Sequence, residues 1–146
     1  MLNIIRASEE NINELSQMAL ELWPENNIED LKRDFAYIIG HLSDKVLLAQ
    51  IENEYAGFIH MSVRKDYVEG SSSNPVGYIE GLFVKPEYRG KDVGTELYNA
   101  GAKWVKKKGC TEIGTDCTIS NRVSFDFLIK MGFEEANRII CFIKDI

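Results

Sequence analysis

The chain has 146 residues, enough for one hydrophobic core, and we predict a single domain spanning residues 1–146. Its formal net charge of −6, from 17 basic and 23 acidic side chains, argues against nucleic acid as a partner, because phosphate binding needs a basic surface. No apolar run approaches the ~20 residues of a membrane helix. Residues 1–6 lack the pattern of a secretory signal, so we expect a cytoplasmic protein that does not bind membranes.

The cysteine and histidine positions argue against a metal centre. The three cysteines, Cys110, Cys117 and Cys141, form no Cys-x-x-Cys pair, and the two histidines, His41 and His60, are far apart in the sequence. Zinc sites in proteins bring such ligands together at short, characteristic spacings. We therefore predict no metal site and interpret the cysteines as small buried thiols.

The hydrophobic pattern predicts strands and helices along the whole chain. In chain order, we expect a strand at residues 3–7, helices at about 9–22 and 29–39, strands at 46–51, 55–64 and 76–84, a helix at 93–108, a strand at 111–116, a helix at 121–131 and two short strands from 133 onward. The segment 69–75 is a polar loop that is too short for a domain linker. This order of elements predicts a mixed α/β layer fold.

One predicted strand carries a charge where an apolar side chain is expected. Glu80 alternates with Tyr78 and Leu82, which places the three on one face of the strand at 76–84. A carboxylate on such a face is costly unless the face is wet or functional, or the carboxylate is part of an ion pair. We favour a functional role for Glu80 over a purely structural ion pair.

The segment after this strand has the features of a phosphate-binding loop. It reads KPEYRGKDVGTEL over residues 85–97, leaving a strand and beginning a helix. A glycine-bearing loop in that position points free backbone N–H groups at one spot, and the helix dipole adds positive potential there. Arg89 and Lys91 add mobile cations. The pattern indicates a pyrophosphate cradle, although an ordinary charged strand-to-helix turn has the same composition.

A second segment, Ser120-Asn121-x-x-Ser124 followed by a helix and Met131-Gly132-Phe133, lies further along the chain. Together the two segments resemble the GNAT superfamily of N-acetyltransferases. In that family the loop reads Arg/Gln-x-x-Gly-x-Gly/Ala and the later motif reads Asn-x-x-Ala-x-x-x-Tyr-x-x-x-Gly-Phe. The resemblance implies a central, mostly antiparallel mixed sheet with splayed strands, flanked by helices. It also implies acetyl-CoA as the acetyl donor.

The same resemblance assigns cofactor contacts to particular positions. In this family the pantetheine arm of CoA lies along the strand before the loop, the pyrophosphate sits on loop amides, and the asparagine of the later motif binds the pantetheine arm. The corresponding positions here are Leu82, Phe83, Val84, Arg89, Gly90, Lys91, Asp92, Val93, Gly94, Thr95 and Asn121. An amide of the splayed strands is expected to donate to the thioester oxygen in the transition state.

Two positions depart from the family pattern. Asp92 stands where the family usually has its first glycine. Its side chain could cap the helix, but a carboxylate beside a pyrophosphate is repulsive, so we predict that it turns away and that cofactor affinity is reduced. Leu128 stands where the family often has a tyrosine general acid, so we expect water or another residue to protonate the leaving thiolate.

A closer resemblance is to the aminoglycoside 6'-N-acetyltransferases. It is carried by scattered segments, namely Leu22-Trp23-Pro24, residues 64–70, 73–76 and 80–84, Thr115-Asp116 and residues 132–135. This resemblance implies a homodimer and assigns the antibiotic to Trp23, Tyr67, Glu80 and Asp116. Such an antibiotic is a polycation with sugar rings, which suits carboxylates and aromatic faces. Asn137 and Phe142 replace a family glutamate and tyrosine, which predicts a narrower or altered amine specificity.

These residues predict direct acetyl transfer. Glu80, through a water molecule, takes a proton from the substrate ammonium and Asp116 holds the amine. The amine then attacks the thioester without a covalent enzyme intermediate. Two alternatives stay open at this point. The amine could belong to a polyamine, a protein N-terminus or a lysine, and the domain could be a non-catalytic module that binds an acyl-CoA.

Overall fold

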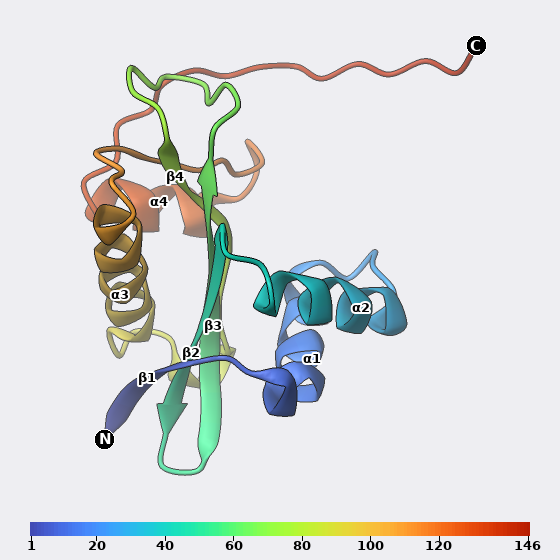
Figure 1. The fold of residues 1–146 in the computed structure, drawn as a ribbon, viewed down its shortest axis with the longest axis vertical. Helices are drawn as coiled ribbons and strands as arrows, with labels where there is room; N and C mark the ends of the chain where they lie inside the picture. The colour runs from blue at the N-terminus through green and yellow to red at the C-terminus, as the bar shows by residue number, and fades with distance from the viewer.

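The computed structural model describes all residues from 1 to 146, and its centre is one five-stranded sheet (Figure 1). The strands are β1 (Leu2–Arg6), β2 (Asp44–Ile51), β3 (Glu54–Arg64), β4 (Val76–Val84) and β5 (Ile113–Gly114). They follow the order β1-β2-β3-β4-β5 across the sheet. Neighbours from β1 to β4 are antiparallel, whereas β4 and β5 are parallel. The predicted mixed α/β fold is therefore confirmed.

Helices cover both faces of this sheet (Figure 1). They are α1 (Ile12–Leu22), α2 (Ile28–Ile39), α3 (Val93–Lys107) and α4 (Arg122–Lys130), with short 3-10 turns η1 (Glu9–Asn11) and η2 (Pro86–Tyr88). Helices α1 and α2 lie against one face, and α3 lies against the other. None of these helices combines the length and the apolar character that crossing a bilayer requires.

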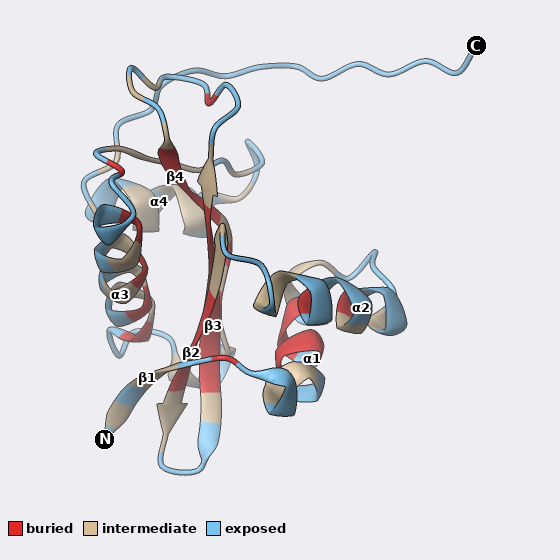
Figure 2. Ribbon diagram, viewed as in Figure 1, coloured by how far each residue is buried: buried red, intermediate tan, exposed pale blue.

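Two hydrophobic clusters fill the spaces between these layers. Leu15, Phe35 and Phe58 belong to the cluster under α1 and α2, whereas Ile59 and Met61 belong to the cluster under α3. Because side chains alternate along a strand, β3 contributes to both clusters. Figure 2 shows the buried residues along the strands and on the inner faces of the helices. The alternation predicted for the strand at 55–64 is confirmed.

The strand predicted at 111–116 is wrong in length, and its shortness opens the sheet. Strand β5 pairs with β4 only at Gly77 and Tyr78. Just beyond that pair, the Thr115 hydroxyl donates to the Ile79 carbonyl at 3.1 Å. A side chain that takes up a strand carbonyl in this way competes with the backbone ladder and ends it. The outer edge of β4 after Tyr78 therefore has no neighbouring strand, which is the splaying expected from the resemblance.

The two short strands predicted from residue 133 onward are also wrong. Phe133 still packs against Tyr98 and Asn137 still bonds to Glu69, and from Arg138 onward the chain leaves the body as an extended tail (Figure 1). A strand needs a neighbour for its N–H and C=O groups, and no backbone hydrogen bond joins residues 134–146 to another segment. The large apolar side chains of this tail are all exposed: Ile139, Ile140, Phe142, Ile143 and Ile146.

Candidate active site

Glu80 lies at an irregularity in the pairing of β3 with β4. His60 on β3 opposes Gly81, and the next residue, Met61, opposes Ile79. Glu80 is therefore an inserted residue without a partner of its own, which makes the site a β-bulge. A bulge re-aims the side chain of the inserted residue, and bulges are over-represented beside active sites.

The bulge changes which side chains share a face of β4, so the predicted common face for Tyr78, Glu80 and Leu82 is wrong. Leu82 packs against the cluster under α3, whereas Glu80 lines a cavity with Trp23 on the α2 side. The physical reason is that one inserted residue shifts the two-residue alternation by one position. The bulge therefore delivers a charged side chain to a face that would otherwise carry an apolar one.

Two neighbours on β3 hold the Glu80 carboxylate. Ser62 Oγ donates to Oε2 at 2.5 Å, and Arg64 donates with Nε to Oε2 at 2.9 Å and with Nη2 to Oε1 at 2.7 Å. Burial raises the pKa of Glu80, but the hydrogen bonds from Arg64 and Ser62 outweigh burial and leave this pKa below its usual value. Glu80 therefore forms an ion pair with Arg64 and also faces a cavity. A structural ion pair and a functional position, which the sequence presented as alternatives, are both present.

The cavity beside Glu80 has a volume of about 320 Å³. Its other lining residues are Trp23, Asn26, Leu31, Asp34, Phe35, Ile38 and His60. The Trp23 indole lies directly over Gly81, where an added Cβ would come within 2.6 Å of the ring. Only glycine allows this close approach. The structure thus brings Trp23 and Glu80, both predicted site residues, into one cavity with aromatic and acidic walls.

Asp116 joins the same network from the loop after β5. The Tyr78 hydroxyl donates to Asp116 Oδ2, and the Arg64 guanidinium lies over the Tyr78 ring, 3.5 Å from its centroid. Burial and the hydrogen bond to Asp116 both raise the pKa of Tyr78, so this hydroxyl stays protonated as a donor. Glu80 and Asp116 are consequently connected through Arg64 and Tyr78.

Tyr67 lies apart from this network, on the loop between β3 and β4. Its side chain is 77% exposed, and its hydroxyl donates to Glu69 Oε2 at 2.7 Å. Asn137, at the beginning of the tail, donates to the other oxygen of Glu69 at 2.8 Å. No hydrogen bond links Tyr67 to Glu80 or Asp116, and Tyr67 does not line the cavity, so the structure does not bring this predicted contact into the site.

The loop before α3 carries free backbone donors. No protein group accepts a hydrogen bond from the backbone N–H of any residue from Gly90 to Thr95. The first backbone N–H of this segment that has a partner is that of Glu96, which donates to the Asp92 carbonyl at 3.0 Å. Unpaired N–H groups at a helix start, together with the helix dipole, form an anion site. The Asp92 side chain makes no capping hydrogen bond, so the capping role considered for it is wrong.

Close packing and caps hold this loop and α4 in place. An added Cβ at Gly94 would lie 3.1 Å from the Phe127 ring of α4, so the small residue lets α4 approach α3. Arg89 Nε donates to the Val84 carbonyl at 2.8 Å, which ties the loop to the end of β4. Asn121 caps α4 by accepting from the Ser124 amide at 3.1 Å. The amide nitrogen of its side chain remains available to a ligand.

Comparison with known proteins identifies the family. The profile described as the acetyltransferase (GNAT) family matches residues 10–133. The chain belongs to this family. An aminoglycoside N(6')-acetyltransferase type 1 from Acinetobacter baumannii is 31% identical over 146 residues, with 99% of each chain covered. A protein of the same name from Salmonella typhimurium is 34% identical over 126 residues, covering 85% of this chain and 86% of that protein.

Solved structures agree with this assignment. The aminoglycoside N-acetyltransferase AAC(6')-Iy, in complex with the bisubstrate analogue CoA-S-monomethyl-acetylneamine, superposes with a TM-score of 0.95 at 29% identity, covering 100% of this chain and 99% of that one. AAC(6')-Ih from Acinetobacter baumannii gives a TM-score of 0.93 at 30% identity, with the same coverage. The GNAT fold expected from the sequence is confirmed, and this chain is an acetyltransferase.

Asp92 departs from the GNAT pattern in a way that can be tested. Its φ of +63° is in the left-handed region, which costs most L-residues about 1–2 kcal/mol. We expect Asp92→Gly to bind CoA several-fold more tightly and to raise the free energy of unfolding by about 1 kcal/mol, because both the strain and the repulsion disappear.

Asp92→Asn separates the two contributions, because it removes the charge and retains a side chain. It should tighten CoA binding in calorimetry with little change in urea unfolding. Equal CoA affinities for wild type, Asp92→Asn and Asp92→Gly would show that this carboxylate does not face the pyrophosphate.

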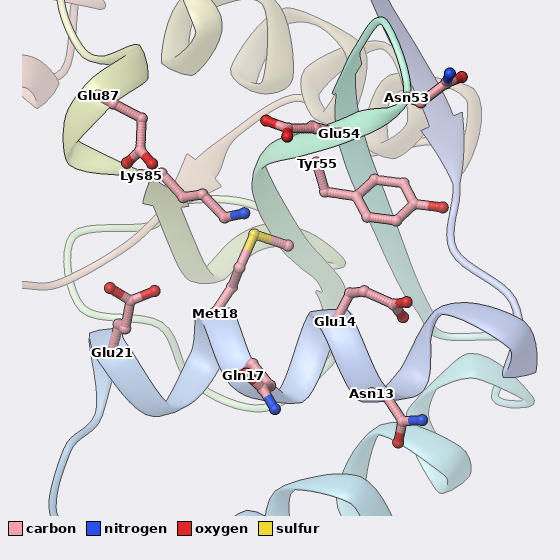
Figure 3. A pocket seen from close by; sticks show the side chains of 10 residues that line it. All are labelled: Asn13, Glu14, Gln17, Met18, Glu21, Asn53, Glu54, Tyr55, Lys85 and Glu87. Carbon is pink, nitrogen blue, oxygen red and sulfur yellow. The ribbon is translucent and has the colours of Figure 1, made fainter.

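A larger hollow, of about 650 Å³, lies elsewhere in this GNAT domain (Figure 3). It is lined from α1 by Glu14 and Glu21, from the start of β3 by Glu54, and from the segment after β4 by Lys85 and Glu87. It lies on the α1 face and contains none of the predicted site residues. The smaller cavity is the better active-site candidate, because it combines an aromatic wall with a carboxylate that the bulge re-aims.

One polar cluster of the site was not predicted from the sequence. His41 and His60, far apart in the sequence, both hydrogen-bond to Asp44, which is the first residue of β2. Asp44 opposes Ser62 in the β2–β3 ladder, and this register brings the three side chains together. Alternation along β3 could have placed His60 on the same face as Ser62 and Arg64, but nothing in the sequence points to Asp44.

Proposed function

We propose that this GNAT enzyme is an aminoglycoside 6'-N-acetyltransferase, which transfers the acetyl group of acetyl-CoA to a primary amine of the antibiotic. One observation carries the proposal. Glu80 is hydrogen-bonded to Arg64, the Arg64 guanidinium stacks on the Tyr78 ring, and Tyr78 is hydrogen-bonded to Asp116, so both carboxylates are connected beside the aromatic cavity, next to the point where β4 loses its neighbouring strand. The similarity to aminoglycoside acetyltransferases over nearly the whole chain supports the same substrate class.

The chemistry of the site suits a polycation with sugar rings. Glu80 and Asp116 attract ammonium groups, and the Trp23 ring offers a face on which a sugar ring can stack. The exposed pair of Tyr67 and Glu69, on the loop between β3 and β4, offers a further aromatic face and carboxylate. A protein with net charge −6 also attracts a cation over long range.

The free donors of the loop suit the diphosphate of CoA. In this proposal, the N–H groups from Gly90 to Thr95 bind the pyrophosphate, with Arg89 and Lys91 nearby as cations. The pantetheine arm lies along the open edge of β4 at Leu82, Phe83 and Val84. The side-chain amide nitrogen of Asn121 donates to that arm.

Glu80 acts as the general base through a water molecule. Both of its oxygens already accept hydrogen bonds from Ser62 and Arg64, so a bridging water is the natural intermediary. Asp116 orients the substrate ammonium. The deprotonated amine then attacks the thioester carbonyl, and a β4 amide on the open edge stabilises the oxyanion. With Leu128 in place of a tyrosine, water protonates the departing thiolate.

An assay of CoA thiol release tests this function. Kanamycin and tobramycin should give turnover well above that with spermidine or a peptide. Higher turnover with spermidine or the peptide would show that the substrate is another amine and not the antibiotic. Release of no thiol with any amine, despite CoA binding, would make the domain a non-catalytic acyl-CoA module.

We also propose that the enzyme is a homodimer and that it acts in the cytoplasm. Support for a second copy comes from two uncovered apolar surfaces, namely the exposed tail residues and α4, where no residue is buried and Val123 is 75% exposed. Exposed apolar surface of this extent marks a protein–protein contact. In a symmetric dimer, the partner copy presents the same two apolar surfaces.

Deletion of residues 138–146 is therefore expected to convert a dimer into a monomer, because it removes the apolar tail and keeps the contact of Asn137 with Glu69. Light scattering after size-exclusion chromatography measures the mass of each protein. A matched control replaces the charged tail residues Arg138, Lys144 and Asp145 with serine and should remain dimeric. A monomeric full-length protein would contradict the proposed assembly.

A further inference from the structure

Two histidines and one carboxylate form a row that begins at the wall of the active-site cavity. Asp44 Oδ1 is 2.7 Å from His60 Nε2, and Asp44 Oδ2 is 3.0 Å from His41 Nδ1. Exposure increases outward along this row, from 10% for the His60 side chain to 17% for Asp44 and 43% for His41. The row therefore runs from the interior of the domain to solvent.

The inner end of this row meets Glu80. The bulge places Glu80 beside Gly81, which opposes His60, and both Glu80 and His60 line the same cavity. The His60 ring is held by an edge contact with Phe35, with the centroids 6.5 Å apart. Its Nδ1 has no hydrogen-bond partner within the protein, and the residue itself lines the cavity.

The acetyl transfer proposed above leaves one proton to be removed in each turnover. The substrate ammonium loses one proton before it attacks and a second after the new bond forms, whereas the departing thiolate takes up only one. Glu80 is a poor final acceptor for this proton, since its oxygens already accept hydrogen bonds from Arg64 and Ser62. A bound antibiotic also fills the cavity mouth, so a second exit for the proton becomes useful.

We propose that His60 and Asp44 form this exit and relay the proton from Glu80 to solvent. The inference rests on the proposed function, because it needs an ammonium substrate. Glu80, protonated by the substrate, transfers its proton to His60 Nδ1. The imidazolium then releases its Nε2 proton to Asp44 Oδ1, and Asp44 loses it to water at the rim, where His41 holds the other oxygen. After the product leaves, His60 returns to its starting tautomer by losing the Nδ1 proton to water in the open cavity and regaining one at Nε2 from solvent through Asp44. His60 and Asp44 act through Glu80 and do not contact the amine.

Charged groups from three other elements surround His60. Asp44 on β2, Glu80 on β4 and Asp34 on α2 are carboxylates that face it or line its cavity. Arg64 on β3 is the opposing cation, and its charge is paired with Glu80. Histidine is the side chain suited to gain and lose a proton near neutral pH.

Replacing His60 tests the relay. His60→Gln should lower kcat by about tenfold or more, because the inner proton acceptor is lost, while the KM for acetyl-CoA stays within about twofold. Added imidazole and its methylated derivatives should raise kcat of the variant in proportion to their concentration and basicity. The kcat of the wild type should not change with these buffers. A packing defect would not respond to the basicity of the buffer.

Asp44→Asn is the second variant, because it retains the shape of the carboxylate and cannot carry the proton. It should show a smaller loss of kcat and the same buffer dependence. Wild-type kcat in both variants, or lower kcat that ignores the buffer series, would overturn the relay. The kcat of each variant is compared with that of the wild type, using the amine that the wild type turns over fastest. The identity of the substrate is decided separately, by assaying the wild type with the different amines.

Discussion

Glu80→Gln is expected to lower kcat by about a hundredfold or more, because general base catalysis contributes that much and an amide cannot accept the proton. The glutamine retains the size of the side chain and an oxygen for the Arg64 donors. The Kd for CoA in calorimetry should change less than about twofold, since the free N–H groups from Gly90 to Thr95 lie in a different part of the molecule. Steady-state thiol release with an aminoglycoside measures the rate.

A matched control is Glu10→Gln, which makes the same chemical change at an exposed position of η1. Its kcat should equal that of the wild type. If Glu80→Gln is as fast as this control, then Glu80 serves only as the ionic partner of Arg64 and another group removes the proton.

Gly57→Ala is expected to destabilise the protein by about 3 kcal/mol, which is the upper end of the usual cost of overpacking. An added Cβ at Gly57 would lie 2.3 Å from the Phe83 carbonyl oxygen and 3.1 Å from the Val84 Cα. Both obstacles are backbone atoms of β4, so no side chain can rotate away. The methyl group would push β3 from β4 at the strand to which the pantetheine arm is assigned. Urea unfolding followed by circular dichroism measures the loss.

Gly40→Ala provides the matched control. Gly40 ends α2 with φ of −85°, which any residue can adopt, and an added Cβ would have only the Tyr37 carbonyl oxygen nearby, at 3.8 Å. This variant should be as stable as the wild type or slightly more stable, because alanine reduces the freedom of the unfolded chain. Equal stabilities of the two variants would mean that β3 and β4 separate without cost.

Sequence patterns within single strands, helices and loops were sufficient to predict much of the fold and part of the site. The alternation along β3 predicted two faces, because side-chain direction in a strand depends only on position parity. The glycine-bearing loop before α3 predicted free donors, because those N–H groups have no partner in the first turn of any helix. Trp23 and Glu80, assigned together by resemblance, do line one cavity.

Features that depend on pairing between distant segments were out of reach. The bulge at Glu80 reflects the register of β4 against β3, and it overturns the assumption that Leu82 shares a face with Glu80. The shared contact of His41 and His60 with Asp44 depends on where β2 begins relative to β3. The tail from Arg138 onward has the apolar composition of strands, but no backbone hydrogen bond joins it to another segment of its own chain.

Arg64 gives the acidic site a built-in counter-ion. An incoming ammonium group does not meet a bare carboxylate at Glu80, because the guanidinium is already bidentate on it at 2.7 and 2.9 Å. A molecule with one positive charge gains little by sharing that carboxylate. A molecule with several charges gains additional contacts at Asp116 and along the rim. The resident arginine thus turns a generally acidic surface into one that discriminates by the number and spacing of positive charges.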